Sequence, residues 1–196
     1  MRRTIITLLL CLLTLDALAL GPWTPTKNYV EGYANLSISS GTQFSAGATY
    51  IRGKQHTKGF FLGAGGGMRY VRSEREQVVE GDVMQYRYGN ETVCPVFVRA
   101  RFGRVNPGKI RPFVTADIGT VLNFSSEGNT KGFFFDPQIG IDFTDCLYVT
   151  LGVDTHHFLR RTIITAGDVI GTIRNPEQKV KSIMSSGLSV RVGYSF

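Results

Sequence analysis

The residues best suited to carry chemistry in this chain are charged side chains that recur at every second position. They stand in several segments, interspersed with glycine, serine and threonine. Because every second side chain of a strand lies on the same face, these charges are predicted to line one side of a sheet. The set comprises Glu31, Arg69, Arg99, Arg101, Asp117, Asp136, Asp142, Asp154 and Arg191. We predict that they form a polar network containing at least one Arg–Asp ion pair.

Other motifs lack the partners that their chemistry requires. His156 and His157 are adjacent, so on a regular strand their side chains point to opposite faces and cannot hold one metal ion together. No serine follows His157 closely enough in sequence to indicate a serine nucleophile with a histidine base. The glycines at positions 63 and 65–67 precede neither a helix start nor the Lys-Ser/Thr of a phosphate-binding loop. We therefore predict no metal, no cofactor and no enzymatic activity.

Residues 1–19 are predicted to be a signal peptide that is cleaved after Ala19. A basic start is followed by a short apolar run and by the small residues that signal peptidase prefers. The run is too short for a membrane-spanning helix, which needs about 20 apolar residues. Residues 20–28 are predicted to be a short leader, and residues 29–196 a single domain.

The composition excludes several classes of protein. The 196 residues include 22 basic and 15 acidic side chains, a mild excess that does not indicate nucleic-acid binding in an exported protein. Cys94 and Cys146 are too few for a scaffold held together by disulfides. The 23 glycines, together with the scarcity of helix-forming runs, favour strands and turns.

Alternation of apolar and polar residues predicts eight strands in the domain. The alternation is clearest in the last segment, where one face would be fully apolar and the other small or polar. That apolar face consists of Leu188, Val190, Val192, Tyr194 and Phe196. The predicted strands are 29–39, 44–53, 59–71, 93–105, 110–123, 132–143, 147–158 and 182–196. An even number of antiparallel strands can close into a barrel that leaves no exposed edge.

The polar face indicates which way the barrel is turned. A soluble barrel buries its apolar face, whereas a membrane barrel exposes that face to lipid. Arginine and aspartate among small residues are typical of a crowded, ion-paired interior rather than of a wet surface rich in lysine and glutamate. Strands of about ten residues also have the length that crosses a bilayer. An eight-stranded barrel is filled by its own side chains, so a wide diffusion pore is not expected.

The chain resembles the small bacterial outer-membrane β-barrel proteins of the OmpA/OmpX or opacity type. In that family the final strand ends in an aromatic residue, usually Phe, preceded by alternating apolar residues, as the 188–196 segment does here. The resemblance implies an all-β, eight-stranded, antiparallel up-and-down transmembrane barrel in a Gram-negative outer membrane. It also implies recognition of the terminal signature by the barrel assembly machinery and contact with lipid and lipopolysaccharide. We expect a monomer.

The part of the molecule that recognises a partner is predicted to lie in its outer loops. Two connections are long, and residues 72–90 continue to alternate, so the third and fourth strands are predicted to extend as a protruding hairpin. The edge of that hairpin could accept a strand from a surface protein. Its candidate partner-binding residues are Arg75, Tyr86, Arg87 and Tyr88. The last loop is basic and could meet lipopolysaccharide phosphates.

These features together predict an integral outer-membrane protein with a structural or adhesion-like surface role. Three alternatives stay open: a narrow channel for small or hydrophobic solutes, a secreted lipocalin-like ligand-binding barrel, and an enzyme that modifies lipid A. The Gly-x-Trp motif of lipocalins is matched at residues 21–23, but this match lies at the predicted cleavage site. On the predicted topology Cys94 and Cys146 lie on opposite sides of the membrane and cannot form a disulfide.

Overall fold

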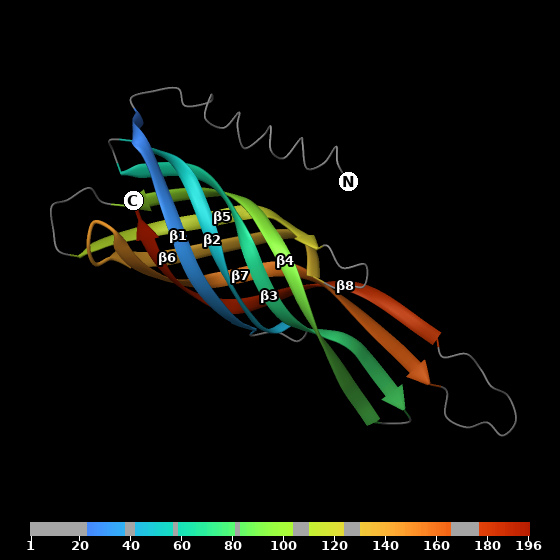
Figure 1. Cartoon of the computed structure of the whole chain (residues 1–196). Coiled ribbons are helices and arrows are strands. Elements are labelled where there is room, and N and C mark those ends of the chain that lie inside the picture. Colours follow the sequence, from blue (N-terminus) through green and yellow to red (C-terminus); the bar gives the residue numbers. More distant parts are fainter. Residues whose placement is uncertain are drawn as a thin grey trace, which may run out of the picture.

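The computed structural model describes residues 23–37, 42–56, 59–80, 83–103, 110–123, 130–165 and 177–196. Eight strands follow one another around a closed barrel (Figure 1). They are β1 Trp23–Ser37, β2 Thr42–His56, β3 Phe60–Glu80, β4 Val83–Gly103, β5 Arg111–Asn123, β6 Thr130–Asp142, β7 Leu147–Thr165 and β8 Glu177–Ser195. The predicted fold class is confirmed. No helix in the described part of the chain is long and apolar enough to cross a membrane.

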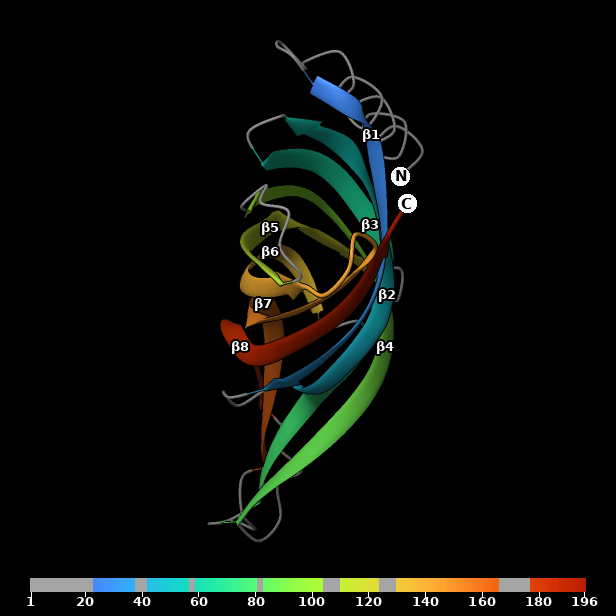
Figure 2. The same cartoon turned by 90° about the vertical axis from the view of Figure 1, so that its left-hand side faces the viewer.

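The barrel wall is closed by antiparallel pairing of β1 with β8. The register runs from Tyr29 opposite Ser195 to Ser37 opposite Gly187. Asn28 and Phe196 exchange both of their backbone hydrogen bonds at 3.0 Å, which extends the seam to the end of β8. A view turned by 90° shows the strands wrapping around one axis (Figure 2). Closure satisfies the backbone groups of both terminal strands, which a lipid environment requires.

The first strand starts earlier than the sequence pattern indicated. Residues 20–28 were predicted to be a leader, yet β1 begins at Trp23 and pairs with β2 there, with an irregular register between Trp23 and Thr26. Pro25 lies within this irregularity, where a missing backbone N–H is tolerated. Residues 1–22, including the predicted signal peptide, lie outside the described residues.

The outer face of the barrel is apolar and the inner face is polar, as predicted. The terminal signature residues Leu188, Val190, Val192, Tyr194 and Phe196 all point outward and are 45–61% exposed. Large apolar side chains on the other strands are exposed in the same way, Met68 and Ile139 among them. This distribution is the reverse of a soluble barrel and provides the apolar surface that a bilayer covers.

An aromatic layer fills the interior at the end of the barrel that holds Phe196. Tyr29 contacts the rings of Phe61 and Tyr148 edge to face, with centroids 4.9 and 5.7 Å apart, and Phe113 contacts Tyr148 at 5.7 Å. Three inward glycines make room for these rings, because a Cβ there would overlap a neighbouring ring. These glycines are Gly63 beside Phe61, Gly140 beside Phe113 and Gly193 beside Tyr148. The small residues of the polar face therefore serve packing as well as polarity.

Four strands continue beyond the barrel wall and form a sheet of their own, at the end away from the C-terminus (Figure 1). β3 and β4 stay paired as far as Glu80 opposite Val83, and β7 and β8 as far as Ile164 opposite Glu177. β3 also pairs with β7 in parallel, from Glu76 with Arg161 to Glu80 with Thr165. The strand order is therefore β4-β3-β7-β8. We call residues 74–80, 83–90, 160–165 and 177–182 the projecting sheet.

The protruding hairpin of the third and fourth strands is confirmed, whereas the matching extension of β7 and β8 was missed. β7 was predicted to end at residue 158 and β8 to begin at 182. Adjacent like residues such as Ile163 and Ile164 break the two-residue period in this stretch. The period disappears because a strand beyond the barrel no longer separates lipid from a polar interior.

The two cysteines lie at opposite ends of the barrel. Cys94 is in β4, opposite Leu122 of β5, towards the projecting sheet. Cys146 is in the turn between β6 and β7, where its carbonyl accepts a hydrogen bond from the backbone N–H of Ser195 at 2.7 Å. Both are free thiols.

The fit between Gly193 and Tyr148 can be tested by substitution. We expect Gly193→Val to lower the free energy of unfolding by about 1–3 kcal/mol, because the new side chain displaces a ring in a filled interior. Gly32→Val is the matched control: it is on the adjacent strand, and a Cβ at Gly32 meets no atom within 4 Å. We expect that control to stay within about 0.5 kcal/mol. The measurement is urea unfolding in lipid vesicles, and equal losses for both variants would contradict this packing.

Candidate functional site

Two arginines and three carboxylates meet in the middle of the barrel. We call Glu31, Arg99, Asp117, Asp136 and Arg191 the central network; all five side chains are at most 3% exposed. Arg99 donates to Asp117 from Nε at 2.6 Å and from Nη2 at 2.7 Å, and to Glu31 from both terminal nitrogens. Arg191 donates to Glu31 at 3.0 Å, to Asp117 at 2.7 Å and to Asp136. The network ties together β1, β4, β5, β6 and β8.

Neutral side chains complete the hydrogen bonding of the carboxylates in this network. The hydroxyl of Tyr148 donates to Glu31 at 2.5 Å, and that of Thr49 donates to the same carboxylate at 3.3 Å. Gln138 donates from its amide to Asp136 at 2.9 Å. Charges taken out of water need such additional partners, because ion pairing alone rarely offsets the cost of desolvation. The centre of the barrel is therefore filled by hydrogen-bonded side chains rather than by an open lumen.

Two further ion pairs flank the central network. Arg69 lies 2.7 Å from Asp154, which also accepts a hydrogen bond from Asn35 at 2.9 Å. At the end of the barrel that holds Phe196, Arg101 donates to both oxygens of Asp142 at 2.6 Å. The guanidinium of Arg101 also lies 3.5 Å from the centroid of the Phe113 ring. All nine charges singled out in the sequence thus lie inside the barrel, and each arginine has an aspartate partner.

Several residues of this interior were not picked out from the sequence. Phe97 and Phe134 pack edge to face between the ion pairs, with centroids 5.9 Å apart. Tyr33 accepts a hydrogen bond from Arg69 at 2.9 Å, and Glu91 accepts one from Asn123 at 2.7 Å. The usable signal was their position, because each stands in phase with a predicted inward charge. Three of the four residues, Phe97, Phe134 and Tyr33, are aromatic, and aromatic residues also occur on the lipid face of such barrels.

The two adjacent histidines point to opposite faces of β7. His156 is buried inside the barrel, with Nδ1 3.9 Å from Asp154, whereas His157 lies outside. Nδ1 of His157 is 3.5 Å from the Ser182 hydroxyl of β8, a pairing that the sequence separation concealed. That distance is at the limit of a hydrogen bond, and no carboxylate pairs with His157 in the described part of the chain. Among the described residues no group of His, Cys, Asp and Glu could hold a metal ion.

A further ion pair, partly buried, joins the two halves of the projecting sheet at its base. Arg160 of β7 lies 3.3 Å from Glu74 of β3, whose side chain is 2% exposed. Burial raises the pKa of the Glu74 carboxyl above its ordinary value, and the charge of Arg160 opposes that rise. The pair stands directly before the parallel pairing of β3 with β7 and fixes the two hairpins to one another.

The candidate partner-binding residues all lie on or beside this sheet. Arg75 occupies an irregularity of β3, since the register skips it between Glu74 and Glu76. The others, Tyr86, Arg87 and Tyr88, stand in sequence on β4 and are exposed. The four residues thus lie close together on β3 and β4, with Tyr86 and Tyr88 on one face of the sheet and Arg87 on the other.

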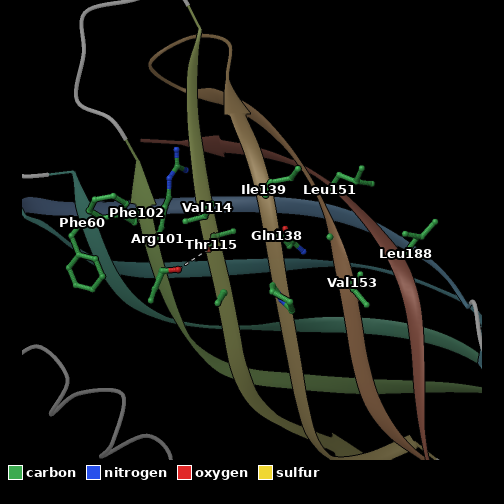
Figure 3. Close-up of a pocket in the computed structure, with 14 residues that line it drawn as sticks. Phe60, Arg101, Phe102, Val114, Thr115, Gln138, Ile139, Leu151, Val153 and Leu188 are labelled. Atoms are coloured by element: carbon green, nitrogen blue, oxygen red, sulfur yellow. Dashed lines mark hydrogen bonds between the residues drawn. The ribbon is translucent and has the colours of Figure 1, made fainter.

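A shallow apolar depression of about 650 Å³ lies on the barrel wall across β3 to β8. Ala100, Ala116 and Pro137 stand in register on neighbouring strands, and larger apolar side chains surround them. Figure 3 shows two of these larger residues, Ile139 and Leu151, on adjacent strands. The depression belongs to the apolar outer surface, where lipid chains would fill it.

An eight-stranded barrel with an apolar outside and an ion-paired inside defines the class of small transmembrane β-barrels. The crystal structure of the outer membrane protein OprG from Pseudomonas aeruginosa is similar to the chain, with a TM-score of 0.55 and 7% sequence identity. The match covers 90% of this chain and 98% of OprG. Neisserial surface protein A aligns with a TM-score of 0.43 and 10% identity, over 87% of this chain and 96% of that one. No protein-family model and no curated protein matches the sequence.

The fold is therefore that of bacterial outer-membrane β-barrels, as the sequence resemblance implied. At this low identity the comparison concerns the fold alone. The shared fold supports a location in the outer membrane.

The central network can be tested through Arg99. We expect Arg99→Ala to lower the free energy of unfolding by about 3–5 kcal/mol, because the substitution leaves Glu31 and Asp117 buried with too few partners. The matched control is Arg87→Ala in the projecting sheet, where Arg87 is 70% exposed and lies 3.8 Å from Glu76. We expect that control to cost at most about 0.5 kcal/mol. The measurement is urea unfolding followed by the gel shift between folded and unfolded barrel; unchanged stability of Arg99→Ala would refute the network's structural role.

Proposed function

We propose that this protein is a non-conducting outer-membrane barrel that holds the projecting sheet at the cell surface, where the sheet binds a macromolecular partner. The observation that carries the proposal is the sheet itself. Four strands continue past the barrel, and a parallel β3–β7 pairing and the partly buried Glu74–Arg160 pair join them into one unit. A barrel that needed only to be stable in the membrane would require no such extension.

The orientation of the barrel follows from its connections. In outer-membrane barrels the short turns face the periplasm and the longer connections face the outside. The tight β6–β7 turn is closed by a hydrogen bond from the N–H of Phe143 to the carbonyl of Leu147 at 3.0 Å, at the end that holds Phe196. The projecting sheet lies at the opposite end, which supports its placement outside the cell.

The interior argues against the channel alternative. The guanidinium groups of Arg99 and Arg191 and their carboxylate partners bridge strands from across the barrel. An eight-stranded barrel has just enough width for its inward side chains. The exposed apolar belt likewise argues against a soluble lipocalin-like barrel, which would bury that face.

We also propose the contacts that the resemblance implied for the barrel itself. The alternating apolar side chains of β8, from Leu188 to Phe196, lie on the outer face, where the barrel assembly machinery can reach them. Exposed lysines at 179 and 181 of β8 support contact with lipopolysaccharide phosphates near the membrane surface. A monomeric state stays a prediction.

Conductance tests the closed interior. We expect the purified barrel in planar lipid bilayers to give no stepwise ion current, because the central network occupies the lumen. A general porin reconstituted in the same bilayers provides the positive control. Reproducible current steps from the wild-type protein would reverse the choice between a surface-interaction protein and a channel.

Binding by the projecting sheet is tested by shortening it. We expect removal of residues 76–87, with an Asn-Gly turn in their place, to leave a folded barrel and to abolish partner binding. The Asn-Gly turn suits a two-residue hairpin connection. The measurement applies nanodiscs carrying either protein to arrays of purified extracellular proteins, and the heat-dependent gel shift checks the fold. Identical binding profiles for both proteins, or no binding by the wild type, would contradict the proposed function.

A further inference from the structure

Within the described part of the chain, the projecting sheet has two open edges. β4 pairs with β3 from Val83 onward but with β5 only from Val93, so residues 83–92 have a partner strand on one side alone. β8 pairs with β1 only from Gly187, which leaves its first residues in the same situation. Alternate residues of a strand direct their N–H and C=O groups to each side, so both edges present hydrogen-bonding groups that a further strand could use.

The side chains distinguish the two edges. The β8 edge carries exposed Lys179 and Lys181, and lysine on an edge strand opposes the addition of another strand. Between Val83 and Asn90 the β4 edge has no lysine, proline or carboxylate. Its exposed large hydrophobic side chains are Val83, Met84, Tyr86 and Tyr88, which are 40–60% exposed. Tyrosine, methionine and arginine are the residues enriched in the cores of protein interfaces.

We infer that the β4 edge, residues 83–90, binds an extended segment of another protein as an added strand. The inference rests on the proposed function, because it takes the projecting sheet to be the binding part of the molecule. Main-chain hydrogen bonds supply affinity in this mode of recognition, and the side chains that alternate along the edge supply specificity. The edge is held in place before binding by its continuous pairing with β3, which reduces the entropy lost on association.

The rows along β4 define the chemistry of the partner segment. Met84, Tyr86 and Tyr88 share one face, so the residues of an added strand beside them are apolar or aromatic. The other face presents Arg87, which is 70% exposed. Its ion-pair contact with Glu76 is long, at 3.8 Å, so its charge is largely open to a partner. The guanidinium of Arg72 lies 5.9 Å from the centroid of the Tyr88 ring, so this second positive charge is on the face of Tyr88. The complementary segment alternates apolar and acidic residues.

The same charges argue against a second copy of this chain as the occupant. Two β4 edges placed side by side would bring arginine to a strand that holds no carboxylate between Val83 and Asn90. Like charges across neighbouring strands destabilise the pairing. A segment from a different protein can supply the missing acidic residues.

The test uses the full protein in nanodiscs and a phage-displayed library of random twelve-residue peptides. We expect the enriched peptides to alternate apolar and acidic residues. The double variant Met84→Lys/Tyr86→Lys is expected to weaken their binding about tenfold or more, because two lysines replace the apolar row that the apolar residues of the peptide contact. The matched control, Gln178→Lys/Val180→Lys on the β8 edge, should bind like the wild type. Methylation of every second backbone nitrogen of the peptide should abolish binding when the methylated nitrogens are those that donate to β4. Methylation of the other set of nitrogens should leave binding unchanged.

The outcomes separate this inference from the proposed function. The β4 variant could bind the peptides as well as the wild type does, while the barrel without residues 76–87 does not bind them. That result would overturn the β4 edge as the binding site and retain the projecting sheet as the binding part. Peptides that also bind the shortened barrel, or no enrichment over empty nanodiscs, would overturn both. Self-association of the wild type that the β4 lysines abolish would replace the foreign segment by a second copy. Binding that is unchanged by methylation of either set of nitrogens would overturn strand addition.

Discussion

The ion pairing of Arg99 and Arg191 with Glu31, Asp117 and Asp136 is the interaction on which the rest of this structure depends. Five strands contribute to it, so the barrel cannot change its register without breaking several charge-assisted hydrogen bonds at once. Replacing such a network with apolar residues is often neutral or stabilising in other proteins. Here the network fills a narrow interior and fixes a single register among the eight strands.

A filled interior moves any function to the surfaces of the barrel. The wall faces lipid and the end that holds Phe196 has the tight β6–β7 turn, whereas β3, β4, β7 and β8 extend at the other end. The extension is ordered by pairing rather than left as a loop, and an ordered surface loses little conformational entropy when it binds. Stability and the proposed recognition therefore reside in different parts of the same strands.

The sequence predicts the barrel well and the projecting sheet only in part, for a physical reason. Within the membrane each strand separates lipid from a polar lumen, so Arg99 and Val98 must alternate, and a two-residue period reveals both faces. The period identifies inward charges but not their pairing, which depends on tilt and register; Arg191 with Asp136 could not be read from spacing. Beyond the membrane both faces meet water, and the extension of β7 to Thr165 lost its signal. The parallel β3–β7 pairing joins segments distant in sequence and leaves no local pattern.

The parallel pairing of β3 with β7 also bears on how the molecule is assembled. It joins strands from opposite sides of the ring, which the chain produces far apart in time, and such non-local contacts form late because a long loop must first be closed. The strand order β4-β3-β7-β8 can be complete only when the seventh and eighth strands have joined the ring. The projecting sheet is thus complete only in a finished barrel, and a partner that binds it, as proposed, would bind only barrels whose assembly is complete.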